Sequence, residues 1–117
     1  MPDTKELVRL IEQGNYDATF AKLYAEDKTV IARQRARYVE AIHQFAALYG
    51  ETRQVRLYSA PGRTEIGGNH TDHNNGVVMA AAVNLDIIAV VSQNDDNIVR
   101  VKSAGFEKQD VVELNCL

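Results

Sequence analysis

The sequence predicts an α+β fold, in which N-terminal helices are followed by a mixed, largely antiparallel β-sheet. The prediction comes from a change of hydrophobic period. Before Gly50 the apolar residues recur at the spacing of amphipathic helices. After Gly50 apolar and polar residues alternate, or apolar residues form short runs rich in β-branched side chains. The length of 117 residues suits one domain or part of one, so we expect residues 1–50 to be helical and residues 51–117 to be mainly strands.

Three helices are predicted in the first half of the chain, each from a capping residue followed by an apolar stripe. The capping residues are Asp3 for the first helix, Asn15 or Asp17 for a short second one, and Asp27 for a longer third one. Gly14 is expected to end the first helix and Gly50 the third. The third helix also carries three arginines, which indicate a solvated helix face, with an anion site as the alternative. They are Arg33, Arg35 and Arg37.

The second half of the chain has the patterns of β-strands. The predicted strands cover residues 55–59, 77–83, 86–91, 98–102 and 109–114. The apolar run at 77–91 could also be helical, but its β-branched residues favour two strands. Asn94-Asp95-Asp96-Asn97 is a turn signal, so we expect the strand at 98–102 to pair with the one before it.

Composition excludes several classes of function. The net charge of −3 gives no electrostatic case for binding nucleic acid. The apolar run at 77–91 is too short to span a membrane and is interrupted by Asn84 and Asp86. Cys116 is the only cysteine, and no apolar signal core follows Met1, so a cytoplasmic location is expected. The chain stops directly after a strand pattern, which suggests that it is part of a longer protein.

Residues 60–76 concentrate small, polar and charged side chains and predict a ligand-binding loop between two strands. Its glycines let the backbone approach a small molecule closely. Pro61-Gly62 predicts a turn, directly after which Arg63 offers a planar guanidinium suited to a phosphate. Short polar side chains that can bridge neighbouring sugar hydroxyls follow. They are Asn69, His70, Thr71 and Asp72.

Each of these residues also has an alternative interpretation. Arg63 can form a structural ion pair with Glu65 or Asp72, and the asparagines and aspartate can cap their own turns. His70, Asp72 and His73 are metal-ligand types, which would suit a metal-dependent hydrolase. That hypothesis is the weaker one, because neighbouring Asp and His side chains point apart on a regular backbone.

The order of residues in this segment resembles the galactokinase signature. The resemblance is carried by Ala60-Pro61-Gly62-Arg63, by His70-Thr71-Asp72 and by Asn74-Asn75-Gly76. The wider family includes homoserine, mevalonate and phosphomevalonate kinases. The resemblance implies the N-terminal domain of galactokinase-type kinases, which has the ribosomal protein S5 domain 2-like fold. Residues 1–117 would then be a partial N-terminal sugar-binding domain of a longer kinase.

The resemblance also implies an activity: ATP-dependent phosphorylation of the anomeric hydroxyl of galactose or a related hexose, with Mg²⁺ on the phosphates. Arg63 matches the arginine that stabilises charge in the transition state. The segment from Asn69 to Asp72 matches the residues that hold the sugar, and Ser103 resembles a serine near the nucleotide. In the family the phosphate loop, the magnesium ligands and the catalytic aspartate lie further along, so the 117-residue chain alone is expected to be inactive.

Three positions depart from the family pattern. Glu65, Asn69 and His73 stand where the family has asparagine, glutamate and tyrosine. Asn69 can still bond a hydroxyl, but it lacks a charge-assisted acceptor worth roughly 1–2 kcal/mol. The substrate is therefore galactose held differently or another hexose. The same departures leave open a non-catalytic, sugar-sensing regulator on this scaffold.

Overall fold

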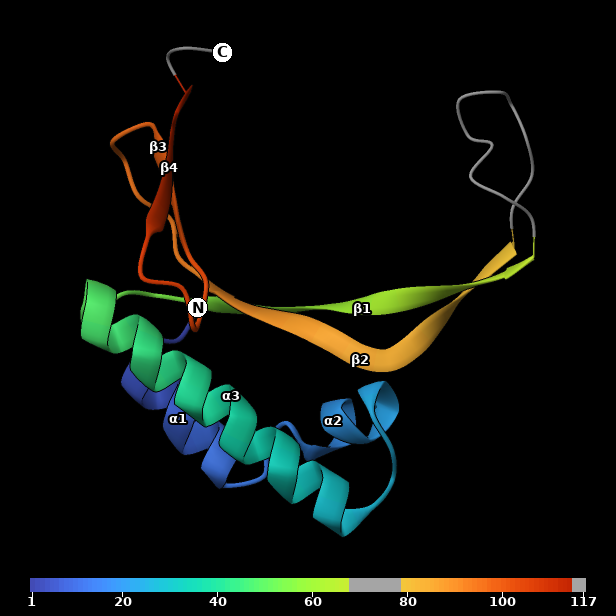
Figure 1. Cartoon of the computed structure of the whole chain (residues 1–117). Coiled ribbons are helices and arrows are strands. Elements are labelled where there is room, and N and C mark those ends of the chain that lie inside the picture. Colours follow the sequence, from blue (N-terminus) through green and yellow to red (C-terminus); the bar gives the residue numbers. More distant parts are fainter. Residues whose placement is uncertain (68–78, 115–117) are drawn as a thin grey trace.

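The computed structural model describes residues 1–67 and 79–114, which form three helices followed by four strands. The helices are α1 (Thr4–Glu12), α2 (Asp17–Leu23) and α3 (Lys28–Tyr49). The strands are β1 (Arg56–Gly67), β2 (Met79–Val91), β3 (Ile98–Lys102) and β4 (Gln109–Glu113). The helices form one layer, β1 and β2 form a ribbon across it, and β3 and β4 form a hairpin that stands off to one side (Figure 1). The predicted α+β class is confirmed.

Two of the three predicted caps are confirmed. The Asp3 carboxylate accepts from the Glu6 amide at 2.9 Å, and the Asp27 carboxylate accepts from the amide of Thr29 at 2.8 Å. The second helix differs, because its N-cap is Tyr16 and no side chain caps it. Asp17, the first residue of α2, instead pairs with Arg35. Its carboxylate gains more from a guanidinium than from a backbone amide, since both partners are charged.

The core lies between the helices and the inner face of the ribbon. Its buried side chains are Leu7, Ile11, Phe20, Tyr38, Ile42 and Val55. The ribbon adds alternate residues, Leu57 from β1 and Ile88 and Val90 from β2, which pack against this cluster. Their neighbours in sequence face outward, as the two-residue period of a strand requires. Tyr58 and Ile87, for example, are exposed.

The strands pair differently from the prediction. The apolar run is extended from Met79 to Val91, as predicted, but it forms one strand, β2, instead of two. β1 pairs only with β2, and β3 pairs with β4, so the structure has two antiparallel two-stranded sheets in the described residues. The expected pairing of 98–102 with the preceding strand is therefore wrong. A local turn signal gives the change of direction at 94–97, but it cannot specify which partner the next strand takes.

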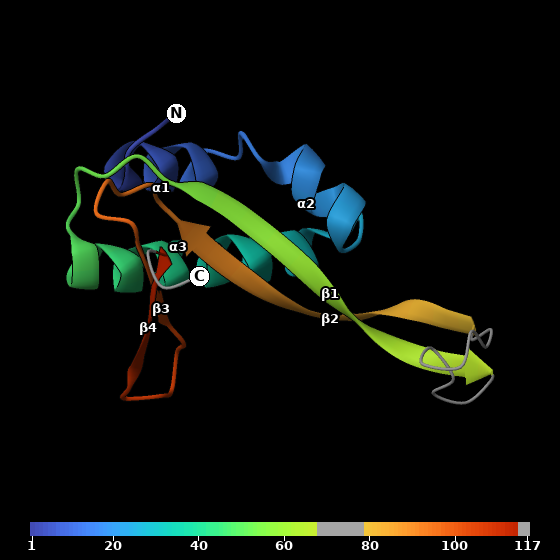
Figure 2. The same cartoon turned by 90° about the horizontal axis from the view of Figure 1, so that it is seen from above.

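The first strand is also longer than predicted. β1 continues through Pro61 and Gly62 as far as Gly67, so the expected turn at this dipeptide is wrong. A two-stranded ribbon has free edges, and a proline without an N–H is tolerated there. Figure 2 shows that this length carries the ribbon across the helices and well beyond them. The radius of gyration of 17.5 Å accordingly exceeds the value of about 13 Å for a compact domain of this length.

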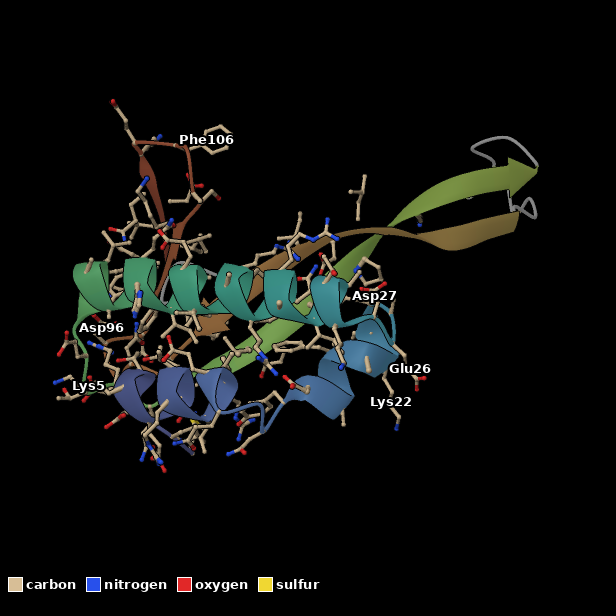
Figure 3. All side chains as sticks on the ribbon, turned by 90° about the horizontal axis from the view of Figure 1, so that it is seen from below. Lys5, Lys22, Glu26, Asp27, Asp96 and Phe106 are labelled. Atoms are coloured by element: carbon tan, nitrogen blue, oxygen red, sulfur yellow. The ribbon has the colours of Figure 1, made fainter. Side chains whose placement is uncertain are left out.

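The hairpin of β3 and β4 contacts the helical layer through Gln109, which pairs with Lys102 next to the turn. The Gln109 amide donates to the Tyr49 hydroxyl at the end of α3. At the open end of the hairpin, the Leu114 amide donates to the Asn97 carbonyl at 2.9 Å. Phe106 lies in the turn, is 69% exposed, and points away from the helices (Figure 3).

We expect Ile42→Ala to lower the free energy of unfolding by about 2–5 kcal/mol, because Ile42 is fully buried and the core cannot collapse completely around the cavity. Urea unfolding followed by circular dichroism measures the change. The control is Leu48→Ala on the same helix, where the side chain is 53% exposed and the loss should stay below about 1 kcal/mol. Equal losses for the two variants would contradict this assignment of the core.

Candidate functional site

The structure describes two of the six predicted site residues. Arg63 lies in β1, is exposed, and pairs through its backbone with Ala82 of β2. Ser103 is exposed directly after β3, where its carbonyl accepts from the Phe106 amide at 3.2 Å. The other four predicted residues lie outside the described residues. They are Asn69, His70, Thr71 and Asp72.

Arg63 and Ser103 are not brought together. Arg63 is on the part of the ribbon beyond the pair Pro61–Asp86, and Ser103 is in the turn of the β3–β4 hairpin. Figures 1 and 2 both show the turn of this hairpin and the outer end of the ribbon at opposite sides of the molecule. A site shared by Arg63 and Ser103 would therefore have to extend from the outer ribbon to the turn of the hairpin. The roles of both residues stay predictions.

The ribbon changes its register between the part that packs on the helices and the part that carries Arg63. Pro61 pairs with Asp86, and the next pair is Arg63 with Ala82. Between these pairs β1 has only Gly62, whereas β2 has the three residues 83–85. Extra residues on one strand bend it and increase its twist. Figure 1 shows β2 bending where it passes α2.

Asp86 lies at this register shift and is held by four hydrogen bonds. Its Oδ2 accepts from the Tyr24 hydroxyl at 2.6 Å and from Ser59 Oγ at 2.5 Å, and its Oδ1 accepts from Arg37 Nη1 at 2.6 Å. Its carbonyl accepts from Arg37 Nη2 at 3.0 Å. Arg37 thus binds both the side chain and the backbone of Asp86. We call these four residues, Tyr24, Arg37, Ser59 and Asp86, the Asp86 cluster.

The Asp86 cluster links the helical layer to both strands of the ribbon. Tyr24 follows α2, Arg37 belongs to α3, Ser59 to β1 and Asp86 to β2. The Asp86 side chain is only 9% exposed, and a carboxylate buried to that extent needs charged and hydrogen-bonding partners to remain ionised. The contacts therefore hold one charged group and, through it, the angle between the helices and the ribbon.

An aromatic group supports the cluster from the helical side. Tyr24 has a single hydroxyl proton, which it donates to Asp86, so Tyr38 donates in the 2.7 Å contact between the two hydroxyls. The rings of Phe20 and Tyr38 lie 5.0 Å apart, and Tyr24 meets Tyr38 edge-on at 6.4 Å. Burial raises the pKa of Tyr24, and so do its bonds to Asp86 and Tyr38. Tyr24 therefore remains a neutral donor.

The pKa of Asp86 reflects opposing effects. Burial raises the pKa, but the hydrogen bonds from Ser59, Tyr24 and Arg37, together with the positive charge of Arg37, hold the pKa below the usual carboxyl value. The group is thus ionised at neutral pH, and the folded state favours its charged form.

The arginines of α3 were expected to form a solvated face, and the structure contradicts this for two of them. Arg35 pairs with Asp17 and Arg37 with Asp86, and both side chains are about one third exposed. Arg33 is exposed, as predicted. Each paired arginine faces a carboxylate from another element, which a sequence pattern within one helix cannot reveal.

The Asp86 cluster was missed by sequence reasoning, although one signal was present. Asp86 interrupts an apolar run between Leu85 and Ile87, as Asn84 also does. A charged residue at such a position either marks a boundary or has a buried partner. In the sequence, Asp86 predicts only the start of the strand at 86–91 and an interruption of any membrane span.

Within residues 1–67 and 79–114, histidine, cysteine, aspartate and glutamate do not gather in a group of three that could hold a metal ion. The proposed metal ligands His70, Asp72 and His73 lie outside those ranges. Among the helices of the described part of the chain, none has both the length and the apolar character needed to cross a bilayer.

Comparison with known proteins adds a family match. The profile described as the galactokinase galactose-binding signature matches residues 43–93, which run from the second half of α3 to the turn after β2. This interval contains Ser59, Arg63 and Asp86 and the segment predicted to bind sugar. No solved structure matches the chain.

Curated relatives agree with the profile. The chain is 33% identical over 72 residues to the galactokinase of Lactococcus lactis subsp. cremoris, which is 62% of this chain and 18% of that protein. It is 36% identical over 69 residues to the galactokinase of Bacillus subtilis, covering 59% of this chain. It is 42% identical over 71 residues to that of Streptomyces coelicolor, covering 61% of this chain. The chain spans about a fifth of the length of the relatives it matches.

In the matched portion the chain is similar to sugar kinases. The particular relatives are galactokinases, and the resemblance predicted from residues 60–76 is confirmed for this portion.

We expect Asp86→Asn to lower the free energy of unfolding at pH 7 by about 1–3 kcal/mol, because the variant keeps the shape and loses the charge that three donors face. Since the folded state lowers the pKa of Asp86, this stabilisation is present above the ordinary carboxyl pKa of about 4 and is lost as the pH falls through the lower, folded value. Urea unfolding at several pH values between about 7 and 2 measures the difference between wild type and variant.

The matched control is Asp95→Asn, a change of the same chemistry in the exposed turn before β3. It should differ little from wild type at every pH. A difference for Asp86→Asn that stays constant down to pH 2, or that is absent at pH 7, would contradict the assigned contacts.

Proposed function

We propose that this chain is the N-terminal, sugar-binding portion of a longer ATP-dependent kinase that phosphorylates the anomeric hydroxyl of galactose or a closely related hexose. The match of residues 43–93 to the galactose-binding signature carries the proposal. The relatives in this region are galactokinases, and their greater length is consistent with catalytic parts that this chain does not contain.

In the proposed reaction the anomeric oxygen forms a bond to the γ-phosphorus of ATP, and the bond from that phosphorus to the bridging oxygen of ADP breaks. The hydroxyl proton passes to a base outside this chain. Magnesium, when bound, neutralises charge on the phosphates. The described residues contain no group of three candidate ligands, so we assign no magnesium contact to them.

The sugar-binding part of the proposal rests on the signature. Asp72 would accept hydrogen bonds from sugar hydroxyls, His70 would orient the ring, and Asn69 and Thr71 would complete the set. Asn69 replaces a family glutamate, and the loss of that charge weakens the hold on one hydroxyl. We therefore expect galactose to be bound more weakly than a glutamate at this position would allow.

Arg63 would act on the transferred phosphate. It is exposed on β1 in the outer part of the ribbon. Among the contacts of the described residues, none ties its guanidinium to a carboxylate, in contrast to Arg35 and Arg37. The planar donors of a guanidinium are suited to bind an anionic ligand.

We expect the complete protein to release ADP from ATP in the presence of galactose, and the 117-residue chain alone to release none. A coupled assay over a panel of galactose, glucose, mannose and N-acetylgalactosamine measures the sugar preference.

Asp72→Ala should abolish the turnover while the circular dichroism spectrum is kept. Binding of galactose by the complete protein without any turnover would favour the sugar-sensing regulator instead.

We expect Arg63→Ala to lower kcat of the complete protein by about 100-fold or more, with a smaller effect on the KM for galactose, because the lost interaction strengthens in the transition state. The control is Arg56→Ala, which removes an exposed arginine from the same strand and should change kcat less than twofold. Similar kcat values for the two variants would remove Arg63 from the mechanism.

A further inference from the structure

The direction of the outer ribbon is set at the pair Pro61–Asp86, where the part that packs on the helices ends. Up to the pair Pro61–Asp86 the inner face of the ribbon packs on the core through Leu57, Ile88 and Val90. Beyond that pair the register shifts, and Figure 2 shows the ribbon continuing past the helices. The outer part therefore takes its direction from the bend and from whatever holds the bend.

The Asp86 cluster holds the bend from both sides. Asp86 is the paired residue of β2 that lies next to the shift on the side of the core. Ser59 of β1, two residues before Pro61, donates to its carboxylate. Tyr24 and Arg37 bind the same carboxylate from the helical layer. Arg37 also binds the Asp86 carbonyl, so both the side chain and the backbone are fixed at this position.

The position of Arg63 is sensitive to the angle at this bend. Arg63 follows Pro61, the last paired residue of β1 before the bend, by two residues, or about 7 Å along a strand. A rotation of about 10° at the bend would move Arg63 by about 1 Å at that distance. Displacements of about 1 Å in a reacting group can reduce rates by about 100-fold.

We propose that Asp86 is a positioning residue for sugar phosphorylation: through Tyr24, Arg37 and Ser59 it fixes the angle at which the ribbon presents Arg63 and the ends of the strands that flank the sugar-binding segment. This inference rests on the proposed function for its activity, but the mechanical part stands on the contacts alone. Asp86 itself touches neither sugar nor nucleotide in this scheme.

The chain offers a matched control in the pair of Asp17 and Arg35. This pair has the same chemistry and also joins α2 to α3, but among the described side chains its hydrogen bonds do not include the ribbon. Asp17→Asn and Asp86→Asn thus both remove a carboxylate that faces an arginine of α3, and they differ in whether the ribbon is attached to it.

The first test compares the kinetics of the complete protein at a temperature at which every variant is fully folded by circular dichroism. Asp86→Asn should lower kcat/KM for galactose by about tenfold or more, and leave the KM for ATP within twofold. Asp17→Asn should leave both within twofold. Unchanged kcat/KM in folded Asp86→Asn, or an equal loss in both variants, would overturn the proposal.

Two milder variants keep the test decisive if Asp86→Asn does not fold. Ser59→Ala and Tyr24→Phe each remove one donor to Asp86 and retain the rest of the side chain. Each should lower kcat/KM for galactose about threefold to tenfold with an unchanged KM for ATP. Wild-type values for both would refute the positioning role.

The second test separates this inference from the proposed function. Amide hydrogen exchange of residues 63–67 and 79–82 reports on the outer ribbon directly and needs no activity. Asp86→Asn should speed exchange there about tenfold, while Asp17→Asn leaves it unchanged. If the wild-type protein phosphorylates no hexose, the proposed function fails, and the exchange comparison still decides whether Asp86 fixes the ribbon. Equal exchange in both variants would reject that role.

Discussion

The architecture depends on one buried charge. Asp86 stands in a strand whose Ile88 and Val90 pack against an apolar core, and removing its carboxylate from water would be unfavourable without partners. Tyr24, Arg37 and Ser59 supply them from three different elements. Because each partner is attached to a separate piece of secondary structure, satisfying the charge also fixes how helices and ribbon are arranged. The same requirement explains why a polar cluster occurs at the edge of an otherwise apolar core.

The β1–β2 ribbon has an anchored part and a projecting part. The inner half of β1–β2 shares the core with the helices, and the outer half extends beyond them (Figure 1). The galactose-binding signature spans this division, since residues 43–93 include the end of α3, the core strands and the outer ribbon. A kinase needs its sugar held rigidly against the phosphate donor. In the proposed function, the helical layer keeps the sugar site rigid through its contacts with the ribbon at the bend.

Sequence reasoning predicted the local features well and the long-range ones poorly. The caps at Asp3 and Asp27, the end of α3 at Gly50 and the extended conformation of β2 follow from a few neighbouring residues. The position of Asp17, the paired state of Arg35 and Arg37, and the pairing of β3 with β4 depend on partners far along the chain. The dipeptide Pro61-Gly62 usually makes a turn, and the pairing of β1 with β2 overrides this preference. The candidate site was predictable only as a motif, since its geometry depends on contacts between segments.

The sequence by itself determined the helical first half, the extended second half and the relationship to galactokinases, because periodicity, capping and a short motif are properties of adjacent residues. Only the tertiary structure decided that Asp86, an apparent interruption of an apolar strand, joins α2, α3 and both strands of the ribbon. The physical reason is that a charge is solvated by whichever donors lie within about 3 Å of it in space. Those donors come from residues 24, 37 and 59, whose separation along the chain gives no sign that they meet.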